Sequence, residues 1–95
     1  MKHVKVMWSH NLPGEPNWIL SELDKDGYEV RKVQIYRDGR CEWTDAQHET
    51  SNIGLSEVPF PDVSEISGQP EFDAVGISCQ YFENVWACAQ DKRRP

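Results

Sequence analysis

The chain has 95 residues, of which 38% are hydrophobic and four are tryptophan, and its formal net charge is −6. This length fits one domain with its own apolar core, so we expect a single domain over residues 1–95. No apolar run approaches the ~20 residues of a membrane-spanning helix, and an acidic chain repels nucleic acid and anionic membranes. Because no apolar signal segment follows Met1, we expect a cytoplasmic protein that binds neither nucleic acid nor membrane.

The charges are unevenly distributed along the chain. Residues 1–40 contain seven Lys or Arg and six Asp or Glu, whereas residues 41–91 contain ten Asp or Glu and no Lys or Arg. The basic residues return only within the tail, residues 91–95, which we expect to fray. A field of one sign steers oppositely charged partners, although acidity that only keeps a protein soluble gives the same composition.

Alternating apolar residues predict two strands at the start of the chain, over residues 3–9 and 17–24. In the first, Val4, Val6 and Trp8 share one face, which is the period-two pattern of a half-buried strand. The intervening residues 10–16 are rich in turn formers and are expected to form a loop.

Two Asp-Gly pairs then predict two hairpins that share a central strand, residues 28–36. We interpret Asp26-Gly27 as a two-residue loop. This register sets Leu23 opposite Val30, and further along the strands it sets an acid, Glu22, opposite a base, Arg31.

The second Asp-Gly pair favours a three-residue loop over residues 37–39, with Gly39 as a bulge. Ile35 then lies opposite Cys41, whereas a two-residue loop would set it against Glu42 and bring a charge onto the buried face. The predicted sheet therefore has one apolar face, which carries Trp18, Leu20, Val33, Ile35, Cys41 and Trp43.

The alternation stops over residues 46–61, which read as irregular chain. Phe60 is expected to close an edge of the core, and residues 61–66 can form one helical turn that points Val63 and Ile66 inward.

A helix is predicted from Cys79 to about Gln90, with Ser78 as its N-cap. Its apolar stripe is expected to cover the sheet, with Glu83 on the solvent side. The stripe consists of Phe82, Val85, Trp86 and Ala89. The predicted fold is therefore α+β: a four-stranded antiparallel β-meander with a C-terminal α-helix packed on one face.

No residue set calls for catalysis, and we expect no catalytic residue, cofactor or metal site. His48 and Glu49 begin like a zinc-protease pair, but position 52 is Asn. The three cysteines form no CxxC pair and are expected to be buried free thiols. Cys79, at a helix N-terminus, is either a reactive thiol or a packing residue. A small-molecule enzyme that uses Cys79 or a histidine remains a third alternative.

Binding residues are expected among the acids and on the strand surface. Tyr36 lies on the opposite face from Ile35, where it is either an exposed interface anchor or a cross-strand aromatic that stabilises the hairpin. The candidate partner-binding residues are Tyr36, Asp38, Glu42, Asp45, Glu49, Glu57, Asp62 and Glu65.

Longer motifs run through nearly the whole chain: Trp8-Ser9-His10-Asn11-Leu12-Pro13-Gly14-Glu15-Pro16, then Gly27-Tyr28-Glu29-Val30-Arg31-Lys32-Val33, then Arg37-Asp38-Gly39. This pattern resembles a family of small bacterial domains with no established biochemical function. Such domains are similar to those of toxin–immunity loci, where small acidic proteins neutralise a toxin, often a nuclease. The resemblance implies an immunity-type inhibitor that occludes the active site of a basic toxin. The alternative is a non-enzymatic structural or adaptor module of a bacterial assembly.

Overall fold

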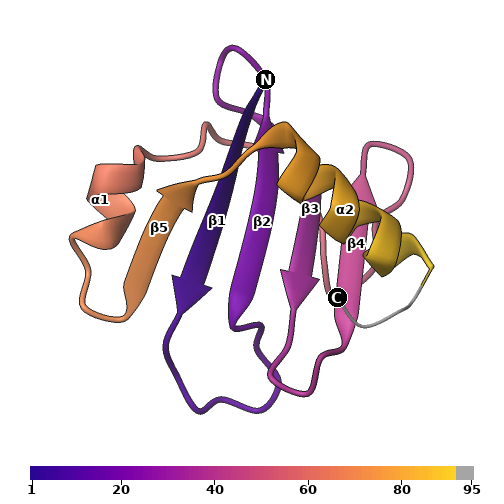
Figure 1. The fold of residues 1–95 in the computed structure, drawn as a ribbon, viewed down its shortest axis with the longest axis horizontal. Coiled ribbons are helices and arrows are strands. Elements are labelled where there is room, and N and C mark those ends of the chain that lie inside the picture. The colour runs from indigo at the N-terminus through magenta and orange to yellow at the C-terminus, as the bar shows by residue number, and fades with distance from the viewer. Residues whose placement is uncertain (92–95) are drawn as a thin grey trace.

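The molecule is an open antiparallel sheet with one helix across part of a face and a shorter helix beside one edge (Figure 1). The structure, a computed structural model, describes residues 1–91. Of the tail expected to fray, residues 91–95, only Asp91 lies within this range, and its N–H donates to the Ala87 carbonyl at 3.1 Å. The elements are β1 (Lys2–Trp8), β2 (Trp18–Leu23), β3 (Glu29–Ile35), β4 (Cys41–Asp45), α1 (Val63–Ser67), β5 (Phe72–Gly76) and α2 (Cys79–Gln90). The α+β class is confirmed, but the sheet has five strands in the order β4-β3-β2-β1-β5, so the prediction of four was wrong.

The additional strand is β5, which pairs antiparallel with β1 and sets Ala74 opposite Val6. Only Ala74 of its five residues is buried, so its alternation is weak. The free edge is covered by α1, because the Ser67 hydroxyl accepts from the Ala74 N–H at 2.9 Å and donates to the Ala74 carbonyl at 3.2 Å. These bonds satisfy backbone groups that would otherwise invite pairing with another chain.

The second hairpin has the predicted turn. Gly39 adopts φ 90°, and its N–H donates to the Tyr36 carbonyl at 2.9 Å. Ile35 therefore lies opposite Cys41, as the three-residue loop requires.

The first hairpin differs from its prediction, because its loop also has three residues. The Asp24 N–H donates to the Tyr28 carbonyl at 2.9 Å, and Gly27 adopts φ 88°. The Asp24 carboxylate accepts from the N–H groups of Asp26 and Tyr28, which favours this turn over a two-residue one. The register therefore sets Leu23 opposite Glu29, and a shift between Glu22 and Leu23 restores the other predicted pairs.

Helix α2 begins and ends at the predicted residues, and the Ser78 hydroxyl accepts from the Tyr81 N–H at 3.0 Å as an N-cap. Its apolar stripe packs on the predicted sheet face, where Leu20 and Val33 are fully buried. The helix crosses the sheet diagonally towards β4 and leaves β5 uncovered on that side (Figure 1).

The second face of the sheet is covered by residues 46–62, which cross it from β4 to α1. The Ser56 N–H donates to the buried Glu29 carboxylate at 2.7 Å, and the Phe60 N–H donates to the Gly27 carbonyl at 2.8 Å. Phe60 and Val63 pack, as predicted, on a second apolar cluster, in which Ile66 is buried with residues of β1, β2 and β5. Neither helix in the described part of the chain has the length and apolar character needed to cross a bilayer.

Candidate functional site

Six acidic side chains are exposed on the segment that covers the second face and on the adjoining edge of the sheet. Residues 46–76 contain no Lys or Arg, and none of the six forms an ion pair with another described residue. These six exposed acids are Glu49, Glu57, Asp62, Glu65, Glu71 and Asp73. Their charges are thus uncompensated by the basic residues of the N-terminal strands.

The eight predicted binding residues do not gather in one patch. Asp38, Glu42 and Asp45 lie on the β3–β4 turn and β4, at one edge of the sheet. Asp62 and Glu65 lie at α1, beyond the opposite edge strand β5. Glu49 and Glu57 lie on the segment that joins these two edges. The acids therefore follow the path of the covering segment across the molecule.

Tyr36 is buried, with an exposed fraction of 6%, so its interpretation as an exposed anchor is wrong. Its hydroxyl donates to the Glu42 carboxylate, and the Arg40 guanidinium lies 4.2 Å from its ring centroid. Burial and the bond to Glu42 raise the pKa of Tyr36 from 10.0 to about 12. This is the cross-strand role that was the alternative interpretation.

A hollow of about 540 Å³ opens beside Tyr36 on the second face. Residues from β1, β2, β3 and β4, from the β1–β2 and β3–β4 connections and from the covering segment line it. We call it the Tyr36 hollow and define it by Trp8, Glu15, Gln34, Tyr36, Glu42 and Asn52. No local sequence pattern indicates this hollow, because its walls join residues that are far apart in the chain.

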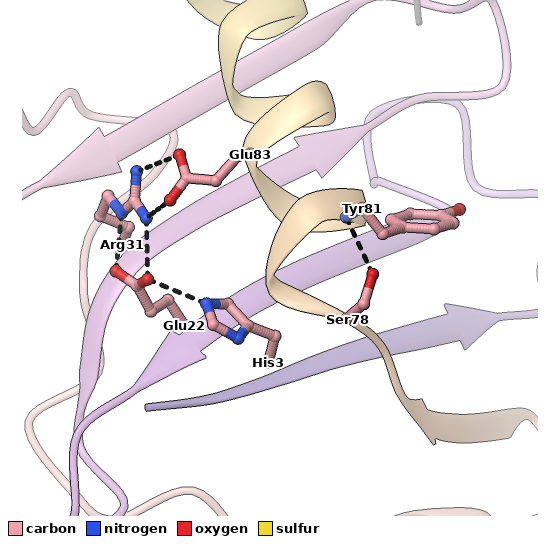
Figure 2. A network of polar contacts seen from close by, with 6 residues as sticks. All are labelled: His3, Glu22, Arg31, Ser78, Tyr81 and Glu83. Carbon is pink, nitrogen blue, oxygen red and sulfur yellow. Dashed lines mark hydrogen bonds and ion pairs between the residues drawn. The ribbon is translucent and has the colours of Figure 1, made fainter.

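A buried polar network joins α2 to the sheet on the other face (Figure 2). Arg31 donates to Glu22 through Nε at 2.6 Å and Nη2 at 2.7 Å, and to Glu83 through Nη1 at 3.1 Å and Nη2 at 2.6 Å. His3 Nε2 lies 2.9 Å from the Glu22 carboxylate. The register predicted the Glu22–Arg31 pair, but His3 and Glu83 depend on non-local packing. Glu83 lies on the solvent side of α2 as predicted, with 43% of its side chain exposed, and from there it also pairs with Arg31.

Electrostatic interactions in this Arg31 network favour the charged forms of Glu22, Arg31 and Glu83. Hydrogen bonds from Arg31, opposed by burial, hold the pKa of Glu22 below its ordinary value of 4.5. Arg31 likewise lowers the pKa of Glu83. Glu22 and then Glu83 raise the pKa of the guanidinium. The side chains of His3 and Glu22 are only 6% and 10% exposed, so the network acts as an internal clamp between α2 and the sheet.

Each histidine is engaged in a packing or loop contact. The His3 ring packs on Phe82 with centroids 5.2 Å apart, and His48 stacks on Trp43 at 3.8 Å. His10 accepts from the Leu12 N–H at Nδ1, which leaves Nε2 to donate to the Pro16 carbonyl at 2.8 Å. The loop over residues 10–16 is thus held by its own histidine.

The three cysteines are less buried than expected. Cys79 is exposed, while Cys41 and Cys88 are half-buried. Among the described residues, no group of three or more His, Cys, Asp or Glu side chains could hold a metal ion.

One family model matches residues 2–91, and its description is a domain of unknown function, DUF6881. The chain belongs to the DUF6881 family. This confirms the part of the resemblance that concerned a domain family of unknown function. No curated protein and no solved structure matches the chain.

Proposed function

We propose that this DUF6881 domain is a non-enzymatic inhibitor that binds a basic bacterial protein, most specifically an immunity-type protein that occludes the active site of a toxin such as a nuclease. The observation that carries the proposal is the set of six exposed acids, none of which is paired within the described residues. An uncompensated field of one sign accelerates encounter with a surface of the opposite sign.

The scaffold that carries these acids supports a binding role. The covering segment is irregular over residues 46–62, yet it is fixed to the sheet through the buried Glu29 carboxylate. A segment held in this way presents its charges without a large ordering cost on binding. The second face thus offers a preformed, acidic surface to a partner.

The direct test is a toxin-inhibition assay. The chain is mixed with a basic toxin encoded beside its gene, and toxin activity is titrated at low ionic strength. We expect a stoichiometric loss of activity and a complex on gel filtration. A variant with the six exposed acids changed to their amides is the control and should inhibit poorly. Absence of any complex at low salt would end this proposal.

The dispersal of the predicted acids over both edges of the sheet favours a second candidate, a structural or adaptor module of a bacterial assembly. Asp38 and Glu65 lie beside opposite edge strands, so an adaptor could contact two neighbours at once. The two candidates differ in one outcome, since an adaptor binds its partner without reducing that partner's activity. An isolated gene with no neighbouring toxin would also favour the adaptor.

A further inference from the structure

The Tyr36 hollow lies on the second face beside the covering segment, which contributes Asn52 to its wall. Ile19, Gln34 and Glu42 are cross-strand neighbours and form part of its lining. Trp8, Glu15, Tyr36 and Arg40 line it as well. Of the two aromatic residues, Trp8 is half-buried and Tyr36 is 6% exposed. The site is thus a hollow with aromatic and anionic residues and one cationic residue, built on the sheet, its connections and the covering segment.

We infer that the Tyr36 hollow receives the side chain of a single arginine from a basic protein partner. This inference rests on the proposed function and names the anchor point of that partner. A guanidinium combines a flat face, which stacks on aromatic rings, with donors that match carboxylate oxygens. Lysine offers a point charge without this planar geometry and is a poorer fit.

The polar groups of the hollow are prepared for such a ligand. Glu42 is oriented at one oxygen by the Tyr36 hydroxyl and at the other by the Asn52 amide at 3.3 Å. Each carboxylate oxygen has a second acceptor site, so Glu42 can accept further N–H donors without losing either bond. Glu15 is exposed and forms no ion pair within the described residues.

The chain itself supplies evidence that a guanidinium suits this place. Arg40 lies 4.2 Å from the centroid of the Tyr36 ring. The two carboxylates exceed this one guanidinium by one negative charge, which a ligand arginine would neutralise. The hollow therefore accepts a second cation on electrostatic grounds and not only by shape.

The test uses a capped Gly-Arg-Gly peptide and the same peptide with neutral, nearly isosteric citrulline. Binding is followed by NMR through the Trp8 indole N–H and the side-chain amides of Gln34 and Asn52. We expect saturable shifts of these groups with the arginine peptide and about tenfold or weaker affinity for the citrulline peptide. A lysine peptide should fall between the two.

Matched variants locate the site. Glu15→Gln and Glu42→Gln should each weaken the arginine peptide by about tenfold, whereas Asp26→Asn, at an exposed acid in the first turn and outside the hollow, should leave it unchanged. Equal shifts with the citrulline peptide, or an unchanged affinity of Glu15→Gln for the arginine peptide, would overturn the inference. The Glu15 variant is needed because Glu42→Gln also alters the hydrogen bond from the Tyr36 hydroxyl. If a basic toxin binds the wild type and both hollow variants equally, this inference alone is overturned. If the hollow binds the arginine peptide but the chain inhibits no toxin, only the proposed function is overturned.

Discussion

Replacing Arg31 by methionine should lower the free energy of unfolding by about 3 kcal/mol at pH 7. Arg31 makes two charge-assisted hydrogen bonds to Glu22, whose side chain is only 10% exposed. Removing one partner of a buried ion pair costs roughly 3–5 kcal/mol, because the other charge stays buried. We expect the lower end of that range, since His3 remains 2.9 Å from Glu22 and Arg31 itself is 20% exposed. Methionine keeps an apolar stem, but it also removes the guanidinium that lies 4.9 Å from the ring centroids of Phe82 and Trp86, so part of the loss comes from these cation–π contacts.

The matched control is Glu83→Gln, which removes the other carboxylate that Arg31 binds. The Glu83 side chain is 43% exposed, so solvent screens this pair, and we expect a loss of less than about 1 kcal/mol. The two variants together separate the buried half of the Arg31 network from its exposed half.

The pH dependence gives the sharper check. The pKa of Glu22 is lowered in the folded state, so its stabilising effect is complete above the ordinary value of 4.5 and is lost as pH falls through the lower folded value. Without Arg31, burial disfavours the charged form of Glu22, and protonation relieves the variant. Urea unfolding followed by tryptophan fluorescence, from pH 7 to about pH 3, should therefore show the difference between wild type and Arg31→Met shrinking. A loss below about 1 kcal/mol at pH 7, or a difference that does not change with pH, would refute the reasoning.

Three further predictions concern the helix, its cap and the buried tyrosine. Trp86→Ala should lower the free energy of unfolding, measured in urea, by about 3–5 kcal/mol, because Trp86 is 8% exposed and packs in the apolar cluster between α2 and the sheet. A loss below about 1 kcal/mol would contradict the docking of α2. Ser78→Ala should cost about 1 kcal/mol by leaving the Tyr81 N–H without its cap, and an unchanged urea midpoint would argue against that bond. Because the pKa of Tyr36 is raised from 10.0 to about 12, the folded state keeps a proton that the unfolded state loses, so stability should fall as pH rises above 10.0. Tyr36→Phe should flatten this alkaline slope, and an identical slope in both proteins would show that Tyr36 does not titrate as described.

The elements that follow from local signals were predictable. Ser78 and the stripe from Phe82 to Ala89 determine α2 because capping and helical periodicity depend on neighbouring residues. The second turn was predictable because the wrong loop would bury a charge. The same test failed at the first turn, since the two-residue register set Leu23 against the apolar Val30 and so raised no conflict. The register shift between Glu22 and Leu23 then brings Glu22 opposite Arg31 as predicted. The predicted strand pairs are therefore compatible with both loop lengths and do not identify the turn.

The features that the sequence could not predict depend on contacts between distant segments. β5 has one buried residue and is stabilised by β1 and by Ser67 of α1, so its own five residues carry little strand signal. Strand alternation placed Tyr36 on the face opposite Ile35 but did not indicate how far that face is covered, and Tyr36 is 6% exposed. Helical periodicity places Glu83 on the solvent side of α2, and it joins the Arg31 network only because the long Arg31 side chain reaches its carboxylate.

The six exposed acids carry the central claim, and the association rate with the basic toxin tests it most directly. Stopped-flow measurements would compare the wild type with the variant in which all six become amides, at low and high ionic strength, after equal urea midpoints have shown that both are folded. Electrostatic steering predicts association at least about tenfold slower for the variant at low salt, and rates that converge at high salt. Equal rates at low salt would contradict the claim that these acids recognise a basic partner.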